Sequence, residues 1–216
     1  MGRVWDIRLG PEYDLLRRSQ RQRLLRDAQQ GTLVATMLAP PCGSFSIAQH
    51  GALRSLSDPW GHPHLTGRLK AKVQHGNALA KAAMHIARRL AQLRVPWILE
   101  HPHSSYLWKC PDMLLLMQHR NVLVLTTDQC AFGTRYRKRT TLLCSGCDDA
   151  DLDALEKRTC NAHHGVCQHS GKPHIRLEGS LTSKSQEYPP RLCRSLADTL
   201  LHQVLHARTL SNYPLG

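Results

Sequence analysis

Short apolar segments alternate with longer helical ones through the first two thirds of this chain. Apolar runs of strand length occupy residues 4–7, 32–38, 96–99, 121–125 and 141–143. Helical patterns lie between them, at residues 13–30, 69–93 and 112–118. Strands that alternate with helices favour a mostly parallel sheet, because a parallel neighbour needs a long crossover connection. We therefore expect an α/β fold whose strands end at one common edge.

The strand predicted at residues 32–38 is followed by two consecutive prolines. Pro40 and Pro41 fix their own φ angles and disfavour helical backbone before them, so the turn is stiff. The turn presents Cys42 at the carboxyl end of the strand, the edge where open α/β sheets bind ligands. A rigidly placed thiol suits a nucleophile, because its direction of attack matters. The alternative is a small apolar residue buried in a turn, as free cysteines often are.

Two acidic residues also follow predicted strands. Asp6 ends the first apolar run, and Glu100 follows residues 96–99. Parallel strands would bring both acids and Cys42 to the same edge. Glu100 alone could equally cap the next turn, but beside Cys42 it is better explained as catalytic. Residues 43–68 have no periodicity and form a long loop after Cys42, which is typical of a functional loop.

The chain is strongly basic, with a net charge of +13 over 216 residues. That length fits one domain, and the charge favours a polyanionic partner, nucleic acid first, although a basic protein without such a partner would have the same composition. No apolar run approaches the roughly 18–20 residues of a membrane span, and no signal peptide is evident. We expect an intracellular protein, nuclear or nucleoid-associated, whose eight cysteines are thiols or metal ligands.

Three motifs in a fixed order point to a family. Pro-Pro-Cys at residues 40–42 comes first, Leu-Glu-His-Pro at 99–102 second, and Phe-Gly at 132–133 with Arg-x-Arg at 137–139 third. In this order they resemble the motifs of the DNA (cytosine-5-)methyltransferases, over roughly residues 4–140. Residues 188–193, Tyr-Pro-Pro-Arg-Leu-Cys, are similar to the last motif of that family.

The resemblance implies roles for individual residues. Cys42 would be the nucleophile, Glu100 the acid that contacts the base, and Arg137 and Arg139 the two arginines of the family's Gln-x-Arg-x-Arg motif. It also implies S-adenosylmethionine as the cofactor and DNA as the partner. Three residues would contact the cofactor: Asp6 at the ribose, Asp14 near the adenine, and Pro40.

The chemistry of cytosine methylation explains why these residue types are needed. Carbon 5 becomes nucleophilic only after a thiolate adds at carbon 6, so a lowered pKa of Cys42 would help, and Arg137 or Arg139 could supply positive potential. Glu100 can protonate or hydrogen-bond ring nitrogen 3, so that the addition leaves no uncompensated anion. The base must first leave the duplex, while basic side chains bind the phosphates.

The chain also departs from the family pattern. The family's first strand and its Phe-x-Gly-x-Gly loop are missing, so the chain begins about where the second strand should be. His101 stands where the family has Asn, and residues 188–193 lack the usual Gly-Asn. We expect a fragment, a late start or a protein that has lost its cofactor, and therefore weak binding of S-adenosylmethionine or none.

Cysteines and histidines gather after residue 143. A Cys-x-x-Cys opens this region, and two further cysteines follow among several histidines, a spacing that tetrahedral zinc sites use. The predicted zinc ligands are Cys144, Cys147, Cys160 and Cys167, with His163 or His169 as substitutes. Alternatively, Cys144 ends a buried strand and the histidines lie in a solvated loop.

Together these patterns predict a Rossmann-like methyltransferase fold without its first strand. Residues 1–143 would form the catalytic part, 144–180 a Cys/His-rich appendage, and 181–216 a helix that packs back on the sheet. The predicted function is methylation of cytosine at carbon 5 in DNA through a Cys42 adduct. The alternative is an inactive, zinc-containing nucleic-acid-binding module derived from such an enzyme. A cysteine hydrolase with His101 or His103 as base is a further alternative, which no oxyanion-hole motif supports.

Overall fold

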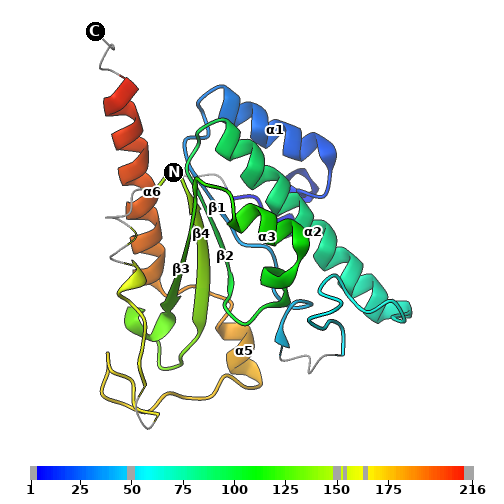
Figure 1. Ribbon diagram of the computed structural model, residues 1–216, viewed down its shortest axis with the longest axis vertical. Helices are drawn as coiled ribbons and strands as arrows, with labels where there is room; N and C mark the ends of the chain where they lie inside the picture. Colours follow the sequence, from blue (N-terminus) through cyan, green and yellow to red (C-terminus); the bar gives the residue numbers. More distant parts are fainter. Residues whose placement is uncertain (1–3, 48–51, 148–151, 153–154, 163–164, 212–216) are drawn as a thin grey trace.

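The structure is a computed structural model that describes residues 4–47, 52–147, 152, 155–162 and 165–211. One sheet is covered on one face by α1, α2 and α3 and on the other by α6 (Figure 1). The main elements, in chain order, are α1 (Arg18–Gln29), β1 (Thr36–Leu38), α2 (Gly67–Gln92), β2 (Trp97–Pro102), α3 (Pro111–Met117), β3 (Val122–Asp128), β4 (Arg139–Ser145), α5 (Ser180–Lys184) and α6 (Pro190–Ser211).

The four strands form a mixed sheet in the order β1-β2-β4-β3. β1 and β2 are parallel, whereas β4 is antiparallel to both of its neighbours, with Glu100 opposite Leu142 and Asp128 opposite Arg139. The α/β fold is therefore confirmed, and the prediction of a mostly parallel sheet is wrong. The reason is local: only residues 129–138 separate β3 from β4, a connection too short to cross over to a parallel neighbour.

The two faces of the sheet bury different sets of side chains. Trp97 and Leu99 of β2 pack in the cluster that includes Ile86 and Leu90 of α2, while the intervening Ile98 packs with Leu192 and Leu196 of α6. This is the alternation expected of a strand covered on both faces. Glu100 continues the alternation on the α6 side, and this position determines its partners.

The amino-terminal segment differs from its prediction. Residues 4–7 do not form a strand; a 3-10 helix occupies Ile7–Leu9, and Val4 is 61% exposed. The strand predicted at 32–38 is limited to β1, which pairs only with β2. An apolar run of this length is ambiguous without a neighbouring strand, and this one has none among the described residues. No helix in the described ranges is long and apolar enough to cross a membrane.

Candidate functional site

Glu100 lies inside β2, directly after the last residue of that strand that pairs with the parallel strand β1, and Cys42 lies in the turn that follows β1. The charge of Glu100 acts on the Cys42 thiol. Two further residues complete the group. Tyr188, just before α6, donates its hydroxyl hydrogen to Glu100 Oε2 at 2.5 Å. Lys138, just before β4, lowers the pKa of both the Cys42 thiol and the Glu100 carboxyl by its charge. Four side chains from four separate segments therefore converge at one edge of the sheet.

Glu100 is a buried acid with one oxygen unsatisfied. Only 5% of the residue is exposed, and Oε1 has no hydrogen-bond partner among the described residues. Burial raises the pKa of this carboxyl, and the hydrogen bond from Tyr188 and the charge of Lys138 only partly oppose the effect. Glu100 can therefore carry a proton at a higher pH than an exposed glutamate, which is the state needed to donate one.

The Cys42 thiol is partly buried and favours its neutral form. Burial raises its pKa, and the Glu100 charge adds to the increase, while Lys138 opposes it. The expected lowering of this pKa is therefore not found in the structure without a bound ligand. A thiol in this state becomes a strong nucleophile only when its proton is removed as the substrate binds.

A buried arginine holds the loop that carries Cys42. Arg54 is 1% exposed, and its guanidinium lies 3.6 Å from the centre of the Phe45 ring. It donates to the Ser44 carbonyl at 2.8 Å and to the Ser44 hydroxyl at 2.9 Å, and to the Pro59 carbonyl at 2.8 Å. Burial lowers its pKa to about 10, so the group stays charged at neutral pH. The sequence analysis missed this residue, because an arginine in an aperiodic loop gives no signal of burial.

Gly76, in the middle of α2, allows the helix to approach the same loop. A Cβ atom at this position would lie 2.2 Å from Ser44 Oγ, well inside van der Waals contact. Glycine costs about 1 kcal/mol relative to alanine inside a helix, so its presence here is explained by this close approach. Arg54 and Gly76 together fix the backbone around Cys42 from two sides.

His101 and His103, the bases of the hydrolase alternative, are both poorly suited to that role. The His101 ring is completely buried and packs edge-on against Phe45 and Trp108. Burial lowers the pKa of His101 to about 3, and the Pro41 backbone opposes this shift in part. Neither ring nitrogen has a hydrogen-bond partner among the described residues. His103 Nδ1 lies 2.8 Å from Thr141 Oγ1. Neither ring is placed beside the Cys42 thiol by any described contact.

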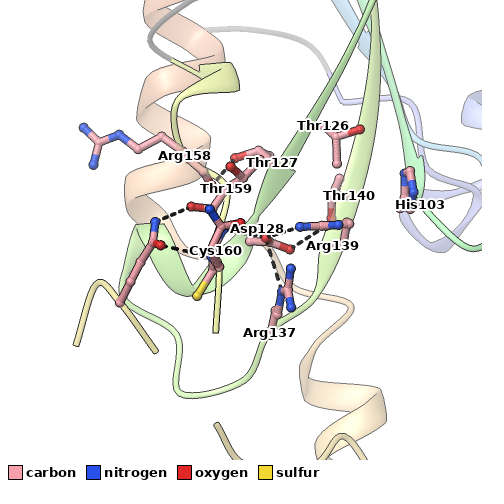
Figure 2. A network of polar contacts seen from close by, with 12 residues as sticks. His103, Thr126, Thr127, Asp128, Arg137, Arg139, Thr140, Arg158, Thr159 and Cys160 are labelled. Atoms are coloured by element: carbon pink, nitrogen blue, oxygen red, sulfur yellow. Dashed lines mark hydrogen bonds and ion pairs between the residues drawn. The ribbon is translucent and has the colours of Figure 1, made fainter. Parts of the chain in front are cut away.

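Arg137 and Arg139 face Asp128, as Figure 2 shows, and not Cys42. Arg139 contacts both carboxylate oxygens of Asp128, at 3.2 and 3.1 Å, and Arg137 Nε lies 3.3 Å from Oδ2. Burial raises the Asp128 pKa, but the hydrogen bonds from Arg139 and the Cys160 backbone, together with both arginine charges, outweigh it and keep the pKa low. Side chains alternate along extended backbone, so the same geometry directs Lys138 to the Glu100 side. Lys138, the residue between the two motif arginines, is therefore the one whose charge acts on Cys42 and Glu100, while its Nζ donates to the Ser185 carbonyl at 2.8 Å.

The two acids assigned to S-adenosylmethionine have partners within their own segment of the chain. Both oxygens of Asp6 accept hydrogen bonds from Arg8, and Asp6 caps a 3-10 helix instead of ending a strand. Asp14 accepts the Leu16 N–H and lies 3.7 Å from Arg17. Pro40 is partly buried in the turn before Cys42.

A second group of thiols lies at the far end of the same sheet edge. Cys130, Cys160, Cys167 and His174 place one ligand atom each within 4.8 Å of all the others. Burial and the neighbouring thiols raise the pKa of Cys130, whereas at Cys167 hydrogen bonds from Ser170, His169 and His174 outweigh burial and lower the pKa to about 6. This Cys₃His group could hold a metal ion such as zinc.

The Cys₃His group that could hold a metal thus differs from the predicted ligand set, although Cys160 and Cys167 are common to both. Cys144 lies inside β4 and packs in the apolar cluster with Ile98, while Cys147 raises the Cys144 pKa by a hydrogen bond, with burial adding to it. His169 contacts the Thr159 carbonyl, and His163 lies outside the described residues. Cys130 was missed because it precedes the Cys/His-rich region by a whole strand.

No protein family, curated protein or solved structure matches this chain significantly. The site is therefore interpreted from its own geometry and chemistry.

Proposed function

We propose that this protein binds a cytosine base of a nucleic acid and adds the Cys42 sulfur to carbon 6 of that base. The observation that supports the proposal best is the pairing of Cys42 with a buried Glu100 whose pKa is raised, next to the point where the parallel pairing of β1 and β2 ends. A thiol alone could serve many reactions. A thiol beside a buried acid suits addition to a ring whose nitrogen must be protonated at the same time.

The proposed step balances as follows. The thiol proton leaves to solvent, and the resulting thiolate forms a carbon–sulfur bond at carbon 6. The electrons displaced from the ring take up the Glu100 proton at nitrogen 3, which leaves a neutral enamine and a Glu100 carboxylate. Lys138 and the Tyr188 hydroxyl are placed to stabilise that carboxylate, because both already favour its charged form.

The unsatisfied Glu100 Oε1 supports a role for this acid in binding the base. A buried carboxyl oxygen without a partner costs about 1–3 kcal/mol, and no described residue satisfies it. A cytosine offers ring nitrogen 3 and the exocyclic amine side by side. A bound base would therefore supply the missing partner.

Methylation at carbon 5 of DNA is the reaction that the order of the motifs implies. S-adenosylmethionine would supply the methyl group when bound, and the enamine carbon would accept it. Since Asp6 and Asp14 are engaged by Arg8 and Arg17, no step is assigned to the cofactor here. The net charge of +13 supports a nucleic acid as the partner.

A second candidate is a nucleic-acid-binding protein in which Cys42 and Glu100 contact a base without catalysis. It is favoured by one observation, the raised pKa of Cys42, which leaves the thiol neutral in the free protein. On this hypothesis Glu100 would recognise the base, and Cys42 would only pack against it.

Trapping with a modified base distinguishes the two candidates. An oligonucleotide that contains 5-fluorocytosine, incubated with the protein and S-adenosylmethionine, should give a covalent complex on a denaturing gel. Cys42→Ser should abolish the complex, while Cys193→Ser, a change at an exposed thiol near Tyr188, should leave it intact. Binding of the oligonucleotide with neither a covalent complex nor cofactor-independent exchange of the hydrogen at carbon 5 would favour the second candidate.

A further inference from the structure

Two segments that are distant in sequence meet at Cys130, Cys160, Cys167 and His174. Cys130 lies in the 3-10 helix Gln129–Phe132 after β3, and the other three lie in the irregular segment 158–175. We propose that these four residues bind one zinc ion, and that the ion fastens segment 158–175 to the end of β3. This inference does not depend on the cytosine chemistry of Cys42.

The distances between the ligand atoms fit a tetrahedral site. With zinc–sulfur bonds of about 2.3 Å, two sulfur ligands lie about 3.8 Å apart. Cys160 Sγ lies 3.9 Å from Cys167 Sγ and 3.8 Å from His174 Nε2. A disulfide would need sulfurs about 2.05 Å apart. Three thiolates and an imidazole are soft ligands that select zinc over magnesium or calcium.

The composition of the lobe formed by Cys130 and segment 158–175 explains why a metal would stabilise it. Its buried cluster consists of Cys130, Cys160 and Cys167, with Ala162 packed against it. No large aliphatic or aromatic side chain belongs to the cluster among the described residues, so apolar burial contributes little. In a lobe of this kind the free energy of metal binding supplies the folding free energy.

The metal ligands are connected directly to the edge strand of the sheet. The Cys160 backbone N–H donates to Asp128 Oδ2 at 2.7 Å, and the Asp128 N–H donates to the Arg158 carbonyl at 2.9 Å (Figure 2). Thr127 Oγ1 donates to the same carbonyl at 3.1 Å. At the other end of the segment, the Ile175 N–H donates to the Arg135 carbonyl at 2.9 Å. Zinc would therefore hold both ends of segment 158–175 against the β3–β4 connection.

Asp128 extends the effect of the metal to the two arginines. Its carboxylate accepts the Cys160 N–H and pairs with Arg137 and Arg139 at the same time. Arg137 and Arg139 remain 33% and 38% exposed, so each can still contact an anion in solvent. Fixing Cys160 by zinc fixes the carboxylate that orients both guanidinium groups.

Metal analysis of the full chain tests the ligand set. Protein purified with zinc should contain close to one zinc per chain, and cobalt(II) in its place should give the visible bands of a tetrahedral thiolate site. Cys130→Ser and His174→Ala should each lose the metal, while the double change Cys144→Ser, Cys147→Ser and the single change His169→Ala should retain it. The conservative variant His174→Cys should also retain the metal, which excludes simple misfolding as the cause of loss.

Hydrogen exchange tests the coupling to β3. Removal of zinc by a chelator should speed amide exchange at least tenfold in residues 158–175 and in the peptide that contains Asp128 and Arg139, while residues 97–102 stay unchanged. A metal-free protein with the same protection, or a Cys160–Cys167 disulfide found by mass spectrometry in freshly purified protein, would overturn the proposal. Metal loss from the Cys144/Cys147 variant would overturn the ligand set.

Discussion

The two sites of this protein, Cys42 with Glu100 and the Cys₃His group, lie along one edge of the sheet and are built in opposite ways. Cys42 stands alone beside a buried acid, its pKa is raised, and Glu100 keeps one oxygen unpaired. The Cys₃His group has four ligand atoms already gathered, and hydrogen bonds lower the pKa of Cys167 despite its burial. The first arrangement offers a buried acid to a planar base. The second offers four ligand atoms to one small ion.

The segment between β3 and β4 serves both groups. Alternation of side chains sends Lys138 toward Glu100 and Cys42, and sends Arg137 and Arg139 toward Asp128, which binds the Cys160 backbone. This one stretch therefore contributes Lys138 to the first site, and two arginines to the aspartate that binds the second site. Despite this shared stretch, the two groups should respond separately to mutation, because no described side chain belongs to both.

The largest expected effect is that of Glu100→Gln on formation of the covalent complex. Glutamine cannot donate the proton that the ring nitrogen needs, so the rate of adduct formation should fall by about 10²–10⁴-fold.

Tyr188→Phe removes only a hydrogen bond to the carboxylate and should reduce the rate by about tenfold. Both rates can be followed by gel with the 5-fluorocytosine oligonucleotide. Zinc content should not change in either variant, and its loss would show that the two groups are coupled.

A smaller effect is expected from Gly76→Ala. The new Cβ would lie 2.2 Å from Ser44 Oγ, so the loop that carries Cys42 must shift. Overpacking of this kind costs about 1–3 kcal/mol, and the better helix propensity of alanine offsets about 1 kcal/mol of it. The net loss is measurable by denaturant unfolding. Gly43→Ala is the matched control, because its Cβ would meet nothing within 4 Å. Equal stability of the two variants would show that α2 does not restrain the loop.

At neutral pH the smallest effect concerns His101, whose contribution appears only as the pH is lowered. Its pKa falls from an ordinary 6.5 to about 3 in the folded chain, so the unfolded state takes up a proton first as the pH is lowered. This residue alone should remove about 1.4 kcal/mol of stability per pH unit below pH 6.5, down to about pH 3. His101→Asn should be less stable at pH 7, having lost its packing on Phe45 and Trp108, but should lose stability less steeply in acid. Parallel curves of unfolding free energy against pH would contradict this.

The sequence was informative where a feature depends on local pattern. The α/β alternation and the long helix α2 follow from the apolar period, and the turn that carries Cys42 after β1 follows from proline chemistry. Glu100, expected after a strand, lies inside β2. The roles of Lys138, Arg54 and Cys130 could not be predicted, because each depends on how distant segments pair. The short β3–β4 connection was a signal for an antiparallel pair. The alternation of side chains along extended backbone would then have placed Lys138 on the opposite face from Arg137 and Arg139. Burial of Arg54 between Phe45 and α2 has no such signal.

Exchange of the hydrogen at carbon 5 of cytosine tests the central claim most directly, because it requires addition at carbon 6 but no cofactor. An oligonucleotide labelled with tritium at that position is incubated with the full chain in the absence of S-adenosylmethionine. We expect release of tritium to water by the unmodified protein and by Cys193→Ser, and none above background by Cys42→Ser. Release that persists in Cys42→Ser, or its absence from an unmodified protein that binds the oligonucleotide, would contradict the assignment of Cys42 as the nucleophile.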